Sequence, residues 1–370
     1  MTPPLQDRKP ATKAFDLLAL VATFAQQHNL GLNDPALVER FLADAAPRLK
    51  TALADPTLIH GARTERMFEA MVLSLGRFRM FKTEDIGRVH SATNYRAADF
   101  RAVLDDGEQW LIEVKNVRCE DPKNQRTTMS AAYLTSLQAY ADAVGVPLRL
   151  AIYWSRWNIW TVIAPKPFLR SNGGLRITMV NAIMANEFGR LGDVSICTKP
   201  PLRLVLGAAT DKPRTLSAEG LAEFIVGSAR VYSGDVELTD PRDRRLAEIL
   251  FLYGEWPADG PFAVMGDDGI AGVEFVATPE EPSDQGFEGI GWASRIFTRY
   301  FATRTVDGEE VIQLNGAAVP EWFAPLAAWH FKSSQLPLWL FHQQPSTEAL
   351  KALAEPDEGQ EQRSPPDDVT

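Results

Sequence analysis

The chain has 370 residues, of which 45% are hydrophobic and 23% charged, the composition of a globular protein large enough for two domains. No apolar run of about 18 residues is present, so we expect no membrane-spanning helix. The two cysteines, Cys119 and Cys197, lie far apart and form no metal-binding pattern with the five histidines, which argues against a disulfide framework and a zinc site. The first residues lack the basic and then apolar pattern of a secretory signal, so we expect a cytoplasmic protein.

The net charge of −10 is unevenly distributed along the chain. Residues 55–207 contain 20 Lys and Arg against 15 Asp and Glu, so the acidic excess lies outside this segment. Residues 346–370 contain seven acidic and two basic side chains and no apolar period, which predicts a disordered acidic tail. The small basic excess of residues 55–207 permits a nucleic-acid-binding segment there.

The N-terminal part of the chain, residues 1–60, is predicted to be helical. Asn33-Asp34-Pro35 predicts the start of its second helix, because a capping residue followed by proline is typical of a helix N-terminus. A third helix is predicted from Arg63 to Leu75, where apolar residues recur on one face, and Gly76 ends it.

An alternation of strand and helix patterns follows. Asp105-Asp106-Gly107 predicts a three-residue hairpin loop, with glycine at the position that needs a positive φ. A helix is predicted over 128–144 and ends at Gly145. The predicted strands are 78–81, 86–90, 99–104, 109–117, 148–154 and 159–164. This order predicts an α/β sandwich with a mixed sheet, to which residues 177–206 add a helix and a strand.

The stretch from Gly207 to Arg214 predicts a domain boundary. Beyond it, a helix from Pro241 to Tyr253 follows the capping residue Asp240, and a strand region covers 261–278. The expected organisation is a helical segment (1–60), an α/β domain (61–207), an α+β domain of unassigned role (215–345) and the acidic tail (346–370).

Three polar side chains are predicted to converge on one face of the sheet. Glu113 and Lys115 are two residues apart in a strand and therefore point the same way. A loop of residues 105–107 pairs Leu104 with Glu108, and this register places Asp99 opposite Glu113, with Cβ atoms about 5 Å apart.

This combination of side chains suits phosphodiester hydrolysis. Two carboxylates so close repel each other, and one takes up a proton unless a cation lies between them. A hard divalent ion, Mg²⁺ or alternatively Mn²⁺, prefers oxygen ligands and would polarise a phosphoryl oxygen and lower the pKa of a bound water. Lys115 would orient that water, help deprotonate it, or stabilise the charge that develops on the phosphate.

At these residues the chain resembles the PD-(D/E)XK nuclease superfamily, which has the restriction-endonuclease-like fold. The resemblance consists of Asp99, thirteen intervening residues, and then Glu113-Val114-Lys115 in an apolar strand. The upstream stretch from Gly61 to Glu69 resembles the G-x-x-x-E-R-x-L/F helix of archaeal Holliday-junction resolvases and related nucleases. The resemblance implies that Glu65 is a metal ligand together with Asp99 and Glu113, and Glu69, one turn along, is the alternative.

The resemblance covers about residues 60–165 and implies an αβββαβ core. It also implies that Gln138, in the helix after the Glu-x-Lys strand, assists catalysis. The exonuclease-like branch has Gln-x-x-x-Tyr in this helix, whereas Asp142 follows four residues after Gln138 here. The chain departs from that branch at this position.

We therefore expect a Mg²⁺-dependent nuclease, a DNA endonuclease of restriction, phage defence or repair, acting as a homodimer because cutting a duplex requires two sites. The alternatives are an RNA substrate, and a catalytically inactive nuclease-fold protein that binds nucleic acid or a partner protein. The simplest competing interpretation of Glu113 and Lys115 is an ion pair on a solvated strand face. Two aromatic clusters, around Arg156 and over residues 292–304, are interpreted as core packing in preference to base stacking.

Overall fold

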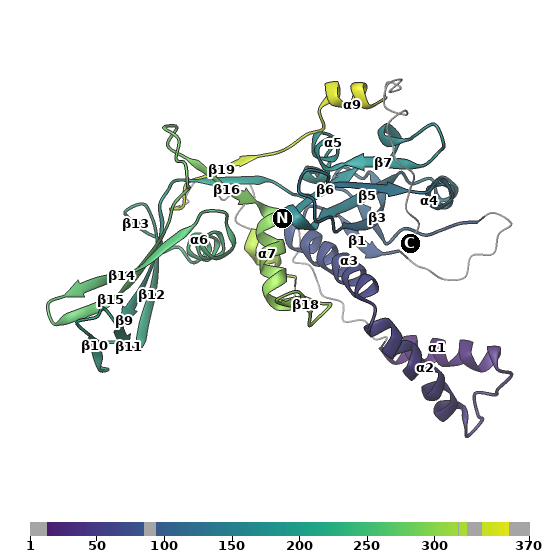
Figure 1. Ribbon diagram of the computed structural model, residues 1–370, viewed down its shortest axis with the longest axis horizontal. Helices are drawn as coiled ribbons and strands as arrows, with labels where there is room; N and C mark the ends of the chain where they lie inside the picture. Colours follow the sequence, from purple (N-terminus) through teal and green to yellow (C-terminus); the bar gives the residue numbers. More distant parts are fainter. Residues whose placement is uncertain (1–12, 85–93, 317, 324–334, 355–370) are drawn as a thin grey trace. The chain divides into compact units, whose positions relative to one another are not determined.

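The computed structural model describes residues 13–84, 94–316, 318–323 and 335–354 (Figure 1). The chain forms two compact units, Met1–His60 and Gly61–Thr370, which are described separately below. None of the helices in the described ranges is long and apolar enough to cross a membrane.

The first unit contains the helices α1 (Lys13–Gln27) and α2 (Leu37–Leu53), as predicted for this segment. Its core is small and consists of Phe24, Ala25 and Leu37, with partly buried apolar neighbours. The helix predicted to open at Asn33-Asp34-Pro35 begins at Leu37, because Asp34 instead accepts a hydrogen bond from the Ala36 amide in a turn.

The second unit contains a mixed five-stranded sheet between two helices. One face packs against α3 (Pro56–Leu75) through residues such as Phe68 and Ile112, and the other packs against α4 (Ala131–Val144) through residues such as Leu111 and Leu137. The sheet order is β1-β2-β3-β5-β6, in which only β3 and β5 are parallel. These strands are β1 (Met80–Thr83), β2 (Phe100–Val103), β3 (Gln109–Val117), β5 (Leu148–Trp154) and β6 (Ile159–Ile163). The α/β class with a mixed sheet is thus confirmed, while the strand predicted at 86–90 lies outside the described residues.

The β2–β3 hairpin has the register predicted from its loop. Phe100 pairs with Ile112, and the Leu104 amide donates to the Glu108 carbonyl at 2.8 Å. Gly107 has a φ of 92°, which few other residues adopt without strain. The same register continued by one residue brings Asp99 beside Glu113.

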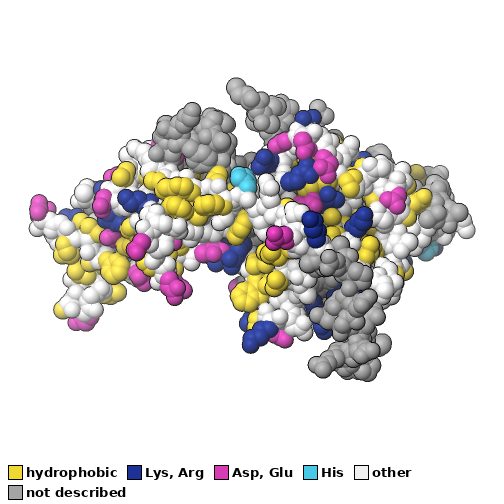
Figure 2. Space-filling view, turned by 90° about the horizontal axis from the view of Figure 1, so that it is seen from above, with side chains coloured by type: hydrophobic (Ala, Val, Ile, Leu, Met, Phe, Trp, Pro, Cys, Tyr) yellow, Lys and Arg dark blue, Asp and Glu magenta, His cyan; other side chains and the backbone are white. Residues whose placement is uncertain are grey.

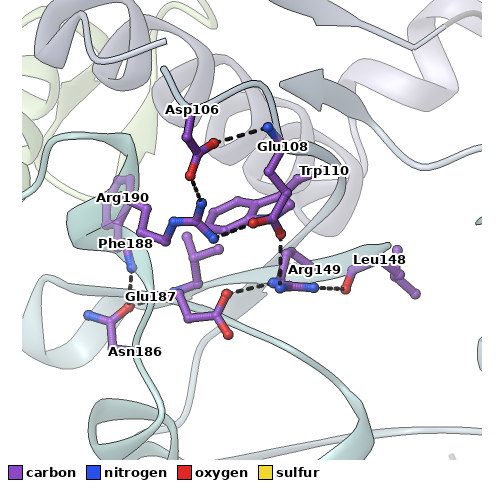
Figure 3. A network of polar contacts seen from close by, with 10 residues as sticks. Asp106, Glu108, Trp110, Leu148, Arg149, Asn186, Glu187, Phe188 and Arg190 are labelled. Carbon is purple, nitrogen blue, oxygen red and sulfur yellow. Dashed lines mark hydrogen bonds and ion pairs between the residues drawn. The ribbon is translucent and has the colours of Figure 1, made fainter. Parts of the chain in front are cut away.

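A polar network anchors the turn of this hairpin (Figure 3). Arg190, in the short 3-10 helix η3 (Phe188–Leu191), forms ion pairs with Asp106 and with Glu108, the latter at 2.6 Å. Glu108 also accepts a hydrogen bond from the Trp110 indole at 2.7 Å, and Arg190 lies 5.1 Å from the centre of that ring. Arg149 lies against the same ring at 4.8 Å. These contacts hold the hairpin that carries the candidate site.

The helix α4 is bounded by residues of the expected types, although it begins later than predicted. The Ser130 side chain accepts from the Tyr133 amide at its N-terminus, and Gly145 adopts a left-handed conformation at its C-terminus. The predicted helix started at residue 128, but β4 (Arg126–Met129) instead pairs with β7 (Leu175–Thr178). A β-branched pair at Thr127 and Thr128 favours this strand.

The strands between residues 195 and 208 pair with later parts of the chain and not with the α/β sheet. β8 (Ser195–Thr198) lies between β16 (Glu288–Trp292) and β19 (Leu338–Phe341). β9 (Leu202–Ala208) lies within the sheet β13-β12-β9-β15-β14. The other strands of that sheet are β12 (Val226–Ser233), β13 (Val236–Glu237), β14 (Ala258–Gly266) and β15 (Gly269–Ala277). The predicted boundary at 207–214 therefore does not coincide with the division between the sheets.

The remaining elements include two long helices. α6 (Pro241–Tyr253) has the predicted bounds and its predicted cap, Asp240. α7 (Ala293–Thr305) packs on the α/β core, where Trp160 donates to the Thr298 hydroxyl at 3.1 Å. The short elements are α5 (Met179–Met184), β10 (Arg214–Leu216), β11 (Ala222–Phe224), β17 (Val306–Asp307), β18 (Glu310–Val311), α8 (Pro320–Phe323) and α9 (Thr347–Ala354). The helix α9 falls in the segment predicted to be disordered, whose remainder, 355–370, lies outside the described residues.

Candidate active site

The structure brings together the three side chains that the hairpin register predicts. Glu113 is almost completely buried, with 3% of its surface exposed. The Val114 amide donates to Asp99 Oδ2 at 2.7 Å, which ties the Asp99 side chain to the neighbouring strand. Lys115 Nζ donates to Glu113 Oε1 at 2.7 Å. The ion pair between Glu113 and Lys115 therefore lies in a partly enclosed site, not on a solvated strand face.

A third carboxylate, that of Glu65 on α3, belongs to the same electrostatic group. Burial, followed by the charge of Glu113, raises the pKa of Glu65. Burial, again followed by the charge of Glu113, raises the pKa of Asp99 to about 7, although the Val114 amide opposes this shift. The site thus contains three interacting carboxylates and one ammonium group.

The other two residues implied by the resemblance have different partners. Glu69 forms an ion pair with Arg66 at 2.9 Å. Gln138 donates to Asp142 on the next turn of α4 at 2.8 Å. Within the part of the chain that the structure describes, no hydrogen bond or ion pair joins Glu69 or Gln138 to Asp99, Glu113 or Lys115.

Two residues that the sequence did not indicate, Tyr133 and Arg96, complete the surroundings. Tyr133, in the first turn of α4, donates its hydroxyl proton to Glu113 Oε1 and accepts from Lys115 Nζ at 2.7 Å. The Arg96 guanidinium lies 4.4 Å from the centre of the Tyr133 ring. The only sequence signal for Tyr133 is its place in the first turn after the cap Ser130, and nothing local indicates that this turn faces Lys115.

The oxygen donors of the site are chemically suited to a hard divalent cation. Carboxylate oxygens are the ligands that Mg²⁺ and Mn²⁺ take, and a cation would relieve the mutual repulsion of Glu65, Asp99 and Glu113. As folded, however, Asp99 and Glu113 direct oxygens at the Val114 amide, Lys115 and Tyr133. Among the described residues, no group of three or more His, Cys, Asp and Glu is arranged to hold a metal ion. Side-chain rearrangement would therefore accompany metal binding.

The Arg63 side chain belongs to the core, and so do most rings of the two aromatic clusters, as predicted for the clusters. Arg63 is buried, donates to the Thr305 hydroxyl at 2.9 Å and lies over the Phe301 ring. The Tyr153 and Trp160 rings are buried and stack at 4.8 Å, and α7 buries its aromatic side chains. Figure 2 shows basic and acidic side chains interspersed on the face that it presents.

Comparisons with known proteins give weak similarity, and to solved structures alone. No protein-family model matches the chain, and no curated protein matches it. Among solved structures, the chain is similar to the Holliday junction resolvase Hjc of the archaeal hyperthermophile Archaeoglobus fulgidus, with 18% identity and a TM-score of 0.28. The match covers 36% of this chain and 99% of the resolvase.

Proposed function

We propose that the chain is a metal-dependent nuclease that hydrolyses phosphodiester bonds at the group formed by Glu65, Asp99, Glu113 and Lys115. The observation that carries the proposal is the burial of Glu113 in contact with Lys115, beside an Asp99 held by the Val114 amide. Burying interacting carboxylates destabilises a fold, and such clusters with perturbed pKa values occur preferentially at functional sites.

Each side chain has a role in this proposal. Asp99, Glu113 and Glu65 would hold Mg²⁺ or Mn²⁺. When bound, the ion supplies positive charge at the phosphoryl group and lowers the pKa of water. Lys115 presents its ammonium beside Glu113 and stabilises the negative charge that develops on the phosphate. Tyr133 keeps Lys115 and Glu113 in contact through its hydroxyl group.

The substrate that fits best is DNA, cut internally, as in restriction, phage defence or repair. The basic excess of residues 55–207, which contain the site, supports a polyanionic substrate. A homodimer would supply the two sites needed to cut both strands, and a cytoplasmic location fits these roles. Sequence or structure specificity would reside in the α+β region that follows residue 207.

The second candidate function is a catalytically inactive protein that binds nucleic acid or a partner protein. It is favoured by the hydrogen bonds that already occupy Glu113 Oε1 and Asp99 Oδ2. A carboxylate satisfied by lysine and tyrosine donors can persist in a fold without a metal, since its charge is compensated.

The test incubates the purified chain with supercoiled plasmid, branched DNA and RNA, in Mg²⁺, Mn²⁺ or EDTA. We expect EDTA-sensitive cleavage that is lost in Asp99→Asn and Lys115→Ala and retained in the matched control Asp142→Asn, an exposed carboxylate on α4. Metal binding is measured separately by calorimetric titration of Mn²⁺. Absence of both metal binding and cleavage, with nucleic-acid binding retained, would instead establish the inactive candidate.

A further inference from the structure

Two cations lie against the same aromatic ring at the candidate site. Lys115 Nζ is 4.6 Å from the centre of the Tyr133 ring, and the Arg96 guanidinium carbon is 4.4 Å from it. The Tyr133 hydroxyl contacts both Glu113 and Lys115. Arg96 and Lys115 therefore contact the same aromatic side chain.

The guanidinium of Arg96 differs from those of the arginines around the same sheet. Arg101 is paired with Glu84 at 2.9 Å, Arg149 with Glu187 at 2.7 Å, and Arg190 with Glu108 at 2.6 Å. Arg96 is exposed, and no acidic side chain among the described residues forms an ion pair with it. Its positive charge is thus not neutralised by a carboxylate of the described chain.

The position of Arg96 is nonetheless fixed. Its backbone amide donates to the Ser136 carbonyl at 3.0 Å, which attaches this part of the chain to α4. The contact with the Tyr133 ring restrains the guanidinium, and because Arg96 is exposed its N–H donors remain open to solvent. A planar guanidinium with free donors matches two oxygens of one phosphate group.

We propose that Arg96, positioned by the Tyr133 ring, binds a backbone phosphate of the nucleic-acid strand. This phosphate lies next to the phosphodiester bond that is hydrolysed. This inference rests on the proposed function, because it takes nucleic acid as the substrate. Tyr133 then has two positioning roles. The Tyr133 ring positions Arg96, and the Tyr133 hydroxyl positions Lys115 and Glu113.

The experiment measures binding of a fluorescent DNA duplex by anisotropy, in Ca²⁺ and at a series of salt concentrations. Each phosphate contact contributes about 0.9 to the slope of log K against log salt concentration. We expect Arg96→Gln to weaken binding by roughly tenfold and to lower the magnitude of that negative slope by about 1. The matched control is Arg48→Gln, which removes an exposed arginine on α2 that pairs with Asp44, and the salt slope of this variant should equal that of the unchanged protein.

Two tyrosine variants separate the tasks of the ring and the hydroxyl group. Tyr133→Phe keeps the ring, so the salt slope should stay unchanged while Mg²⁺-dependent cleavage falls. Tyr133→Leu removes the ring and should lower the slope as Arg96→Gln does. Thermal unfolding of each variant verifies that it is folded before its slope is compared.

The outcomes distinguish this inference from the proposed function. Normal Mg²⁺-dependent cleavage with an unchanged slope in Arg96→Gln would overturn the role of Arg96 and leave the nuclease proposal standing. A lowered slope without cleavage by the unchanged protein would support the phosphate contact and contradict the nuclease proposal. Failure of the unchanged protein to bind the DNA probe would overturn the inference.

Discussion

The Val114 amide donates a 2.7 Å hydrogen bond to the Asp99 carboxylate from the neighbouring antiparallel strand. The β2–β3 hairpin pairs Phe100 with Ile112, which places Asp99 opposite Glu113. The Asp99 side chain therefore lies within reach of the amide of the next residue, Val114. A slip of one residue would send Glu113 and Lys115 to the opposite face. The chemistry of the candidate site therefore depends directly on the register of one hairpin.

The first prediction concerns Asp99→Asn. The asparagine oxygen can still accept from the Val114 amide, so the fold should be retained. Removal of a partly buried charge should leave the melting temperature unchanged or raise it. Cleavage should fall at least about 100-fold, because metal-assisted charge stabilisation contributes several kcal/mol. Cleavage rates and thermal unfolding are measured on the same preparations. A variant as active as the unchanged protein would show that Asp99 has no role in cleavage.

The second prediction separates the two upstream glutamates. Glu65→Gln should weaken Mn²⁺ binding and lower the cleavage rate, because Glu65 interacts electrostatically with Asp99 and Glu113. Glu69→Gln is the matched control one turn along α3. It removes only the surface pair with Arg66, worth at most about 0.5 kcal/mol. Loss of metal binding in Glu69→Gln, with Glu65→Gln unaffected, would reverse this assignment.

The third prediction concerns the network at the hairpin turn. Arg190→Ala removes the ion pairs with Asp106 and Glu108 and the contact with the Trp110 ring. The contacts with Glu108 and Trp110 are partly exposed, and together they should contribute about 1 kcal/mol to the free energy of unfolding, whereas the pair with the exposed Asp106 adds little. Urea unfolding measures this loss, with Arg244→Ala as the control for a single exposed ion pair. Equal stability of both variants would show that the hairpin needs no anchor at its turn.

The hairpin and the convergence of Asp99, Glu113 and Lys115 could be predicted from the sequence because they depend on local information. The loop length fixes the pairing of β2 with β3, and the two-residue period of a strand fixes the directions of Glu113 and Lys115. The start of α6 could be predicted from equally local signals, because Asp240 and the following proline mark it.

Contacts between distant segments could not be predicted in this way. The Tyr133 hydroxyl reaches Lys115 only because α4 packs on the sheet at one particular position, which the helical period does not specify. Likewise, β8 pairs with β16 and β19 from far along the chain, and the pattern of a strand does not indicate which sheet it joins.

The fourth prediction concerns pH and a carboxylate remote from the site, that of Asp193. It accepts hydrogen bonds from the amide and hydroxyl of Ser294, at the start of α7, at 2.9 and 2.8 Å. Burial nevertheless raises the pKa of Asp193 to about 7. Because this value exceeds the ordinary aspartate pKa of about 3.9, the folded state binds the proton more tightly than the unfolded state.

The sign of the effect follows from that difference. The contribution of Asp193 to stability should be fully present below about pH 4 and should be lost as the pH rises towards 7. Asp193→Asn keeps an acceptor for the Ser294 amide but cannot ionise. Its free energy of unfolding, measured in urea from pH 4 to 8, should therefore rise relative to the unchanged protein by roughly 3–4 kcal/mol. Comparing the two proteins at each pH cancels the titration of their other carboxylates. Parallel stability curves would therefore mean that Asp193 ionises at the same pH in the folded and unfolded states, which would contradict the prediction.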